Sequence, residues 1–540
     1  MAKIIIDGEP IECREGVPVL RAALEAGWDV PHYCYHPGLS IVASCRLCLM
    51  EMKLPNPKTQ EMAWSPKLLP SCQTPVRDGL ECRFNSDAVR KNQAQCMEFF
   101  LLNHPLDCPV CDQAGECWLQ DYSFKFGYPE SRMVDQKIKN PKKDIGSKTL
   151  LYQDRCVLCT RCVRFADEVS GTHELAVINR SARLEIDVFP GFPLENPLQG
   201  NVVDICPVGA LLDKDFLFKR RVWELRGTPS ICPHCATGCS IRIDHADNIV
   251  YRIKPRYNPE VNDWWMCDYG RFGYKHVHDN KRIKSPTVRR GFETQTPNWD
   301  EIPDILRYRF EEHVREHGSA GIAAVLSPFM ACEEAWLLAR FMREVAPQCT
   351  LVLGHVPYEG SDQHFPAESP ADTAKFTILR EKCPNRRGVE MVLASAGGAQ
   401  LGFRALVEKA GKGEFSAVWI AGGYLGPWLE PSAAKMAEKV QFLVVQDLFE
   451  NQLTETATVV LPACAWAERE GSFVNATGLV QPFERATNPP EGARRDGQYL
   501  YEIAGFSGLY DAERVREMMA GLISDFAAAY VPPAEPLHAH

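Results

Sequence analysis

No stretch of this 540-residue chain is long and apolar enough to cross a membrane, since a spanning helix needs roughly 18–20 successive apolar residues. The segment from Met1 to Gly8 contains no apolar core and no small-residue cleavage site. No export signal is therefore visible, and we expect the protein to stay where it is made. The chain also lacks the G-x-G-x-x-G and phosphate-loop motifs of common nucleotide sites. Its formal net charge of −10 disfavours nucleic acid as the main partner.

Cysteine is abundant and unevenly distributed. Of 22 cysteines, 18 lie at or before Cys267 and only four follow. A disulfide framework is disfavoured, because such frameworks belong to small secreted domains, whereas this chain is large and shows no export signal. In a reducing compartment, clustered thiols at short spacings indicate metal sites.

The first 85 residues are predicted to form a small β-rich domain with one helix. A hairpin turn is expected at Asp7-Gly8, a helix from Pro18 to Gly27, and strands at 4–6, 10–13, 49–54 and 80–84. This order is typical of a β-grasp ferredoxin. Ser86 then caps a predicted helix that runs to about Asn103.

After about residue 295, strands alternate with helices, which indicates an α/β domain with a mostly parallel sheet. Helices are expected at 333–345 and 432–438, and strands at 321–326, 350–353, 417–421, 442–445 and 458–461. The segment 356–390 looks irregular. The tail from Val531 onward is predicted to be extended or disordered.

The first cysteine group has the spacing C-x10-C-x2-C-x23-C and comprises Cys34, Cys45, Cys48 and Cys72. Three thiolates on one loop and a distant fourth are the plan of plant-type [2Fe–2S] ferredoxins, although the first spacing is longer here. Zinc is the alternative, but the preceding strand–turn–strand–helix pattern favours the cluster. Cys82 is an alternative fourth ligand. It falls within a predicted strand, so Cys72 is preferred.

The second group comprises His104, Cys108, Cys111 and Cys117. Three thiolates need a fourth ligand to hold a [4Fe–4S] cluster, and His104 lies close by at the end of a predicted helix. Histidine ligation is known for iron–sulfur centres and tends to raise their reduction potential. Alternatively, His104 is a helix-terminal cation, and an outside ligand completes the cluster.

The third group, Cys156, Cys159 and Cys162, is the C-x2-C-x2-C run of bacterial ferredoxins, with Cys206-Pro207 as the remote fourth ligand. A two-cluster ferredoxin carries another cysteine where this chain has Ala166, so this block fits one [4Fe–4S] cubane.

The fourth group has the spacing C-x2-C-x3-C-x27-C and comprises Cys232, Cys235, Cys239 and Cys267. Alone it would also fit a zinc ribbon, but beside three other clusters a third cubane is favoured. The remaining seven cysteines are interpreted as ordinary thiols: Cys13, Cys82, Cys96, Cys332, Cys349, Cys383 and Cys464.

The order of these motifs resembles the large iron–sulfur subunit (the G type or 75 kDa type) of NADH:quinone oxidoreductase, respiratory complex I. The most specific matches are the His104–Cys117 block, the Cys156–Cys162 run with Cys206-Pro207, and Cys232–Cys267 followed by Arg271-Phe272-Gly273-Tyr274. Farther on, segments between Gln446 and Asn475 resemble the molybdopterin-oxidoreductase domain of that large subunit.

The resemblance implies one [2Fe–2S] cluster, three [4Fe–4S] clusters and an electron path. NADH would reduce a flavin on a partner subunit, and electrons would pass to the Cys34 cluster, the Cys156 cubane, the His104 cubane and onward toward quinone. In the family, the Cys232 cubane lies off this path. The implied partners are the flavin- and NADH-binding subunit, the small [2Fe–2S] subunit, and downstream [4Fe–4S] and quinone-site subunits. The chain would sit peripherally on the cytoplasmic side of the inner membrane. Outer-sphere transfer needs no acid, base or nucleophile, so no catalytic residue is nominated.

The C-terminal domain departs from its molybdenum-dependent relatives. Formate dehydrogenases of similar layout carry a lysine where this chain has Tyr269, and a catalytic cysteine or selenocysteine whose context no later cysteine matches. We therefore expect no molybdopterin, flavin or NAD on this chain, and a scaffold role for the domain. A molybdenum or tungsten formate dehydrogenase is the main alternative. An iron-only hydrogenase and a non-enzymatic redox sensor or scaffold are the others.

The predicted architecture is thus a series of α+β ferredoxin-like cluster domains followed by an α/β molybdopterin-oxidoreductase-like domain without the molybdenum cofactor. The predicted parts are a β-grasp [2Fe–2S] domain (1–85), a His/Cys3 [4Fe–4S] module (86–125), a ferredoxin-like [4Fe–4S] module (126–225), a molybdopterin-oxidoreductase-type [4Fe–4S] domain (226–290), an α/β scaffold (291–530) and a flexible tail (531–540).

Overall fold

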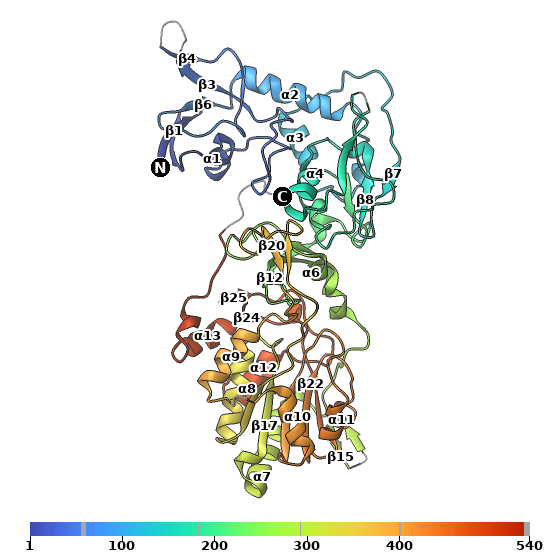
Figure 1. Cartoon of the computed structure of the whole chain (residues 1–540), viewed down its shortest axis with the longest axis vertical. Helices are drawn as coiled ribbons and strands as arrows, with labels where there is room; N and C mark the ends of the chain where they lie inside the picture. The colour runs from blue at the N-terminus through green and yellow to red at the C-terminus, as the bar shows by residue number, and fades with distance from the viewer. Residues whose placement is uncertain (56–60, 182, 292, 399–400, 534–540) are drawn as a thin grey trace. The chain divides into compact units, whose positions relative to one another are not determined.

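The computed structural model describes residues 1–55, 61–181, 183–291, 293–398 and 401–533 (Figure 1). The chain divides into two compact units. Among the described residues, unit 1 comprises Met1–Leu225 and His364–Phe376, and unit 2 comprises Arg226–Gln363 and Thr377–Pro533. Most of the tail predicted to be flexible lies outside the described residues. No helix within the described ranges is long and apolar enough to span a membrane.

Unit 1 begins with a mixed sheet in the strand order β2-β1-β6-β3-β4, with β5 paired to β3. Its strands are β1 (Ala2–Ile6), β2 (Glu9–Cys13), β3 (Leu49–Pro55), β4 (Met62–Trp64), β5 (Leu69–Pro70) and β6 (Glu81–Arg83). The β1–β2 turn holds Asp7 and Gly8 at φ of 51° and 90°. Helix α1 (Val19–Glu25) packs its apolar side chains against alternate residues of β1. The strands and the helix predicted for this region are confirmed.

The remainder of unit 1 is rich in loops. The Ser86 hydroxyl caps α2 (Asp87–Leu101) by accepting the Val89 N–H at 3.3 Å, as predicted. The other helices are α3 (Trp118–Phe126), α4 (Arg161–Phe165), which continues as a π-helical turn over Ala166–Ser170, and α5 (Asn201–Asp204). Strands β7 (Lys142–Asp144), β8 (Thr149–Tyr152) and β11 (Leu211–Asp213) form one antiparallel sheet, and β9 (Leu175–Ile178) and β10 (Glu185–Val188) another.

Unit 2 starts with an antiparallel sheet of β12 (Arg226–Ile231), β13 (Ser240–Ala246) and β14 (Ile249–Pro255), followed by α6 (Asp268–Phe272). Its main sheet has seven strands in the order β16-β15-β23-β22-β21-β17-β18. These strands are β15 (Thr287–Arg290), β16 (Glu293–Gln295), β17 (Ile322–Leu326), β18 (Thr350–Leu353), β21 (Ala417–Ala421), β22 (Phe442–Asp447) and β23 (Val459–Pro462). The pairs from β18 to β23 are all parallel, which confirms the predicted sheet.

Both faces of the main sheet are covered, so its central strands are apolar throughout. Along β17, Ala324 and Leu326 pack with α7 (Ile302–His317) and α8 (Cys332–Val345), whereas Ala323 and Val325 pack with α10 (Phe403–Gly411) and α11 (Ser432–Ala437). These helices can be followed in Figure 1. The remaining elements are β24 (Gly471–Val474), β25 (Val480–Phe483), α12 (Asp496–Ile503) and α13 (Ala512–Ala520).

The segment 356–390 is less irregular than predicted. It contains β19 (Gln363–Phe365), β20 (Phe376–Ile378) and the start of α9 (Arg386–Ser395). The two strands are too short to show an alternating pattern. Helix α9 is stabilised by tertiary packing, since Val389 and Val392 are fully buried in the main core.

Candidate metal centres

The first predicted site is a group of four buried thiols, three of them on the loop from Cys34 to Cys48 (the ligand loop). The exposed fractions of Cys34, Cys45, Cys48 and Cys72 lie between 0 and 7%. A hydrogen bond with the Cys45 thiol lowers the pKa of Cys34 to about 5, and the same pairing raises the pKa of Cys45. Cys48 and Cys72 form a second such pair, and the charge of Cys34 acts on both. The structure therefore brings all four sulfurs together.

The backbone of this loop turns at Ala43 and Arg46, which have φ of 49° and 60°. Cys82, the alternative ligand, is fully buried in strand β6. Burial raises its pKa to about 12, and the charges acting on it are those of Asp7 and Glu81 rather than of the four thiols. This geometry favours Cys72 over Cys82.

The second predicted site surrounds a short 3-10 turn over Cys108–Val110, and α3 begins directly after Cys117. Burial raises the pKa of Cys117 to about 12, and the charges of Cys111 and Cys108 raise it further; Cys111 is buried, Cys117 is half-buried and Cys108 is exposed. His104 follows α2. Burial lowers its pKa to about 4, and the positive charges of Arg155 and Lys137 lower it further. The imidazole is therefore neutral at physiological pH, the state that ligates a metal.

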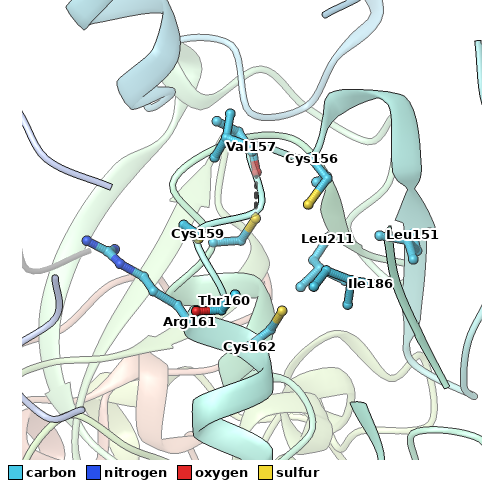
Figure 2. A pocket seen from close by; sticks show the side chains of 12 residues that line it. Leu151, Cys156, Val157, Cys159, Thr160, Arg161, Cys162, Ile186 and Leu211 are labelled. Atoms are coloured by element: carbon cyan, nitrogen blue, oxygen red, sulfur yellow. Dashed lines mark hydrogen bonds between the residues drawn. The ribbon is translucent and has the colours of Figure 1, made fainter. Parts of the chain in front are cut away.

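The third predicted site is a cavity lined by Cys156, Cys159, Cys162 and Cys206 (Figure 2). Its apolar wall comprises Leu151, Val157, Ile186, Val208, Ala210 and Leu211. Leu158 and Thr160 adopt left-handed backbone conformations, with φ of 53° and 60°, in the turns between the first three cysteines. All four thiols line the same cavity, as the spacing predicts.

The fourth predicted site joins the small sheet of unit 2 to α6. Cys232 follows β12, Cys239 precedes β13 and Cys267 precedes α6; with Cys235 they are only 3–4% exposed. The Cys232 N–H donates to the Cys239 carbonyl at 2.9 Å. A Cβ added at Gly270 would lie 2.7 Å from the Cys232 sulfur, so this position requires glycine.

Thiolate and imidazole side chains are the donors that iron–sulfur clusters use. Within the described ranges, no three Cys, His, Asp or Glu side chains form a single-ion site. Zinc draws each sulfur to about 2.3 Å from one atom, whereas each thiolate of a cluster binds its own iron and the thiols surround a larger space. Burial raises the pKa of Cys159 to about 11 and that of Cys267 to about 12, so these thiols need bound metal to ionise.

The second and third sites of unit 1 adjoin through the loop after Cys206. The Trp118 N–H, next to Cys117, donates to the Pro207 carbonyl at 3.1 Å. A Cβ at Gly209 would overlap the sulfur of Cys111. The chain segment that follows Cys206 thus packs against one ligand residue of the second site, Cys111, and against Trp118, which follows another.

The first and third sites adjoin through two arginines that the sequence analysis missed. Arg164 Nη2 donates to the Cys34 carbonyl at 2.5 Å and to the Cys159 carbonyl at 3.3 Å. Arg161 donates to the Tyr35 carbonyl. A sequence signal for these arginines did exist. They are three residues apart, and this spacing places both on one face of the helix that begins at the third site.

Five family models match the chain, in the predicted order of parts. They are a 2Fe-2S iron-sulfur cluster binding domain (1–87), an NADH-ubiquinone oxidoreductase-G iron-sulfur binding region (93–132), an NADH-quinone oxidoreductase subunit 3 ferredoxin-like domain (146–212), a molybdopterin oxidoreductase Fe4S4 domain (225–279) and a molybdopterin oxidoreductase domain (387–506).

Related proteins are named as subunits of NADH-quinone oxidoreductase or NADH dehydrogenase. The G subunit of the NADH-quinone oxidoreductase of Rickettsia conorii is 40% identical over 634 aligned positions, which cover 98% of this chain and 91% of that protein. The corresponding G subunit of Rickettsia bellii is 37% identical over 64% of this chain and 48% of that protein. The NADH dehydrogenase iron-sulfur protein 1 of Solanum tuberosum mitochondria is 41% identical over 53% of this chain and 37% of that protein. The match thus spans about half the length of some curated relatives.

One solved structure, an NAD+-reducing [NiFe]-hydrogenase in the H2-reduced state, is similar at 27% identity over 41% of this chain and 91% of that chain. Its TM-score of 0.36 is too low to bear on the fold.

Fold and sites together define an iron–sulfur protein in which ferredoxin-like modules precede a molybdopterin-oxidoreductase-type domain. The match to the Rickettsia conorii protein covers nearly all of both chains, so it identifies one particular family within this class. This chain belongs to the family of the NADH-quinone oxidoreductase G subunit, which is also named the 75 kDa subunit.

Proposed function

We propose that this chain is the iron–sulfur electron-transfer subunit of an NADH:quinone oxidoreductase. It accepts electrons from a flavin-bearing partner and passes them toward quinone. The observation that carries the proposal is the adjacency of the three sites in unit 1, which are linked through ligand residues. Electron tunnelling falls off steeply with distance and is favoured by covalent and hydrogen-bonded paths, so adjoining sites suit a chain of carriers.

The proposed iron ligands are the sixteen residues predicted from spacing. A [2Fe–2S] cluster would be held by Cys34, Cys45, Cys48 and Cys72, and three [4Fe–4S] clusters by His104, Cys108, Cys111 and Cys117; by Cys156, Cys159, Cys162 and Cys206; and by Cys232, Cys235, Cys239 and Cys267. When bound, the clusters supply one-electron redox chemistry. The residues of the chain orient the clusters and set their potentials through burial and hydrogen bonds.

The proposed order of transfer is from the Cys34 site to the Cys156 site and then to the His104 site. The Cys156 site supports this order because it contacts both neighbours. Arg164 spans from Cys159 to the first site, and the segment Pro207–Gly209 reaches the second.

The C-terminal domain is proposed to be a scaffold without molybdopterin. In open α/β sheets, ligands bind at the carboxyl ends of the parallel strands. Here Asp447, at the end of β22, accepts hydrogen bonds from the Gly423 N–H at 2.8 Å and from the Trp428 indole at 2.9 Å. The buried Arg469 pairs with Glu334 at 2.9 Å. These internal contacts support the proposal that the protein's own side chains fill the region at the carboxyl ends of the strands, where a cofactor would otherwise bind.

The proposed domain boundaries are those of the sequence analysis. The proposed setting is a peripheral position on the cytoplasmic side of the inner membrane. There the chain would contact the flavin- and NADH-binding subunit, the small [2Fe–2S] subunit, and downstream [4Fe–4S] and quinone-site subunits.

Metal analysis of the full chain purified without oxygen tests the proposal. We expect about 14 irons per chain, two from one binuclear cluster and four from each of three cubanes. Low-temperature EPR after reduction by NADH through the flavin partner should show both cluster types. An iron content near two or three with zinc in the other sites would refute the assignment. Stoichiometric molybdenum or tungsten would favour a formate dehydrogenase.

A further inference from the structure

One face of α4 and the π-helical turn after it contacts the backbone of the loop that carries Cys34. Arg161, Arg164 and Glu168, spaced by three and four residues, all contact the segment 34–40. Arg164 also donates to the Ser40 carbonyl, and Glu168 accepts the Ser40 N–H at 2.9 Å. The helix therefore fixes the first site against the third through three charged side chains.

The two arginines are buried, with exposed fractions of 0% for Arg161 and 7% for Arg164. Apart from one long contact of Arg164 to the Thr160 hydroxyl at 3.4 Å, every described hydrogen bond of these two guanidinium groups goes to a main-chain carbonyl. Burying a cation is costly unless a negative charge compensates it. With clusters bound, the ligand thiolates of Cys34 and Cys159, whose carbonyls Arg164 contacts, would supply compensating negative charge beside the arginines.

Of the two arginines, Arg164 is the one that contacts ligand residues of both sites. Its single Nη2 atom contacts the carbonyls of one ligand residue from each site, at 2.5 Å and 3.3 Å. Arg161 is among the residues that line the cavity of the third site (Figure 2), and its guanidinium group lies over the Trp118 ring at 4.5 Å. Arg164 therefore bridges the two sites, and Arg161 lies at the edge of the third site and reaches the Tyr35 carbonyl beside the first.

We propose that Arg164, assisted by Arg161, is the positioning residue for electron transfer between the Cys34 and Cys156 sites. It fixes their separation, and its cation stabilises the added electron on either side. This inference rests on the proposed function. In the step, one electron leaves the Cys34 site, which is oxidised, and enters the Cys156 site, which is reduced. No bond forms or breaks, and no proton is needed.

The test uses the full chain purified without oxygen, as wild type and as the variants R164Q, R164K and E168Q. Glutamine removes the charge, whereas lysine keeps it but lacks the planar fork that reaches two carbonyls. E168Q is the matched control, because Glu168 holds the same loop with the opposite charge. Iron content, midpoint potentials from EPR-monitored redox titration, and the enhancement of [2Fe–2S] spin relaxation by the reduced cubane are measured on each protein.

We expect R164Q to disfavour reduction of both sites about tenfold, which corresponds to about 59 mV for one electron. R164K should retain the potentials but show weaker relaxation enhancement, since the loop is held less tightly. E168Q should shift the potentials in the opposite direction, because it removes a negative charge. If R164Q loads too little iron to titrate, R161Q is measured instead and should shift the potentials in the same direction as predicted for R164Q.

Unchanged potentials in an iron-replete R164Q protein would overturn the inference. So would an E168Q shift of the same sign, since that would assign the effect to loop movement alone. A wild-type chain without iron–sulfur signals would instead refute the proposed function, so the two failures are distinguishable.

Discussion

The substitution Gly270→Ala should remove the proposed Cys232 cluster and leave the other three proposed clusters. The added Cβ would lie 2.7 Å from the Cys232 sulfur, 3.6 Å from the Met266 methyl carbon and 3.8 Å from the Cys267 sulfur. A carbon–sulfur approach below 3.0 Å forces one of the atoms to move. The Cys232 sulfur can escape by rotation about its single side-chain torsion, but that rotation turns it out of the ligand position.

The expected result is a fall from about 14 irons per chain to about 10, because a cubane with three protein ligands is lost. Iron determination and EPR of the reduced chain measure this, and the signals of the three sites in unit 1 should persist. Gly411→Ala is a suitable control, since the nearest described atom to its added Cβ is 4.0 Å away. Full iron content in the Gly270→Ala protein would show that the geometry around Cys232 is wrong.

Three further outcomes are expected. Glu468→Ala should cost about 3–5 kcal/mol in thermal unfolding, because it leaves Arg282 buried without its partner at 2.5 Å, whereas Glu470→Gln should change stability by less than about 1 kcal/mol. Lys382→Met should lower the midpoint potential of the Cys232 cluster in EPR titration, because the charge of Lys382 acts on Cys232 and Cys267. Burial raises the pKa of Asp244, but two arginines bring it below its ordinary value of 3.8, so its stabilising effect should be present above about pH 4 and be lost as the pH falls through the lowered pKa. Asp244→Asn should flatten this acid dependence in denaturant titrations.

Local signals explain most of what could be predicted. The Asp7-Gly8 turn and the Ser86 cap depend on contacts within a few residues, and both are observed. The run from Cys156 to Cys162 is equally local, since three ligands on one short loop leave few ways to arrange the chain. The apolar strands of unit 2 were recognisable because a sheet covered on both faces needs continuous apolar runs.

Contacts between distant residues explain what was missed. Arg164 meets the Cys34 carbonyl across 130 residues, and no local pattern specifies that contact. The ligand loop turns at Ala43 and Arg46, although glycine is the residue that local propensity favours at positive φ. In both cases the tertiary arrangement of the sites imposes a conformation that the neighbouring sequence does not prefer.

The sites differ in how they are connected to one another, and this difference bears on which clusters carry electrons. All four ligands of the Cys232 site come from one continuous segment that runs from the end of β12 to the start of α6. In unit 1, by contrast, Arg164 links the carbonyls of Cys34 and Cys159, and the segment after Cys206 packs against Cys111 and Trp118. A self-contained site can be lost without disturbing the others, whereas removal of the Cys156 cluster should loosen both the Cys34 loop and the Cys111 loop. These contacts predict that the three sites of unit 1 support one another structurally.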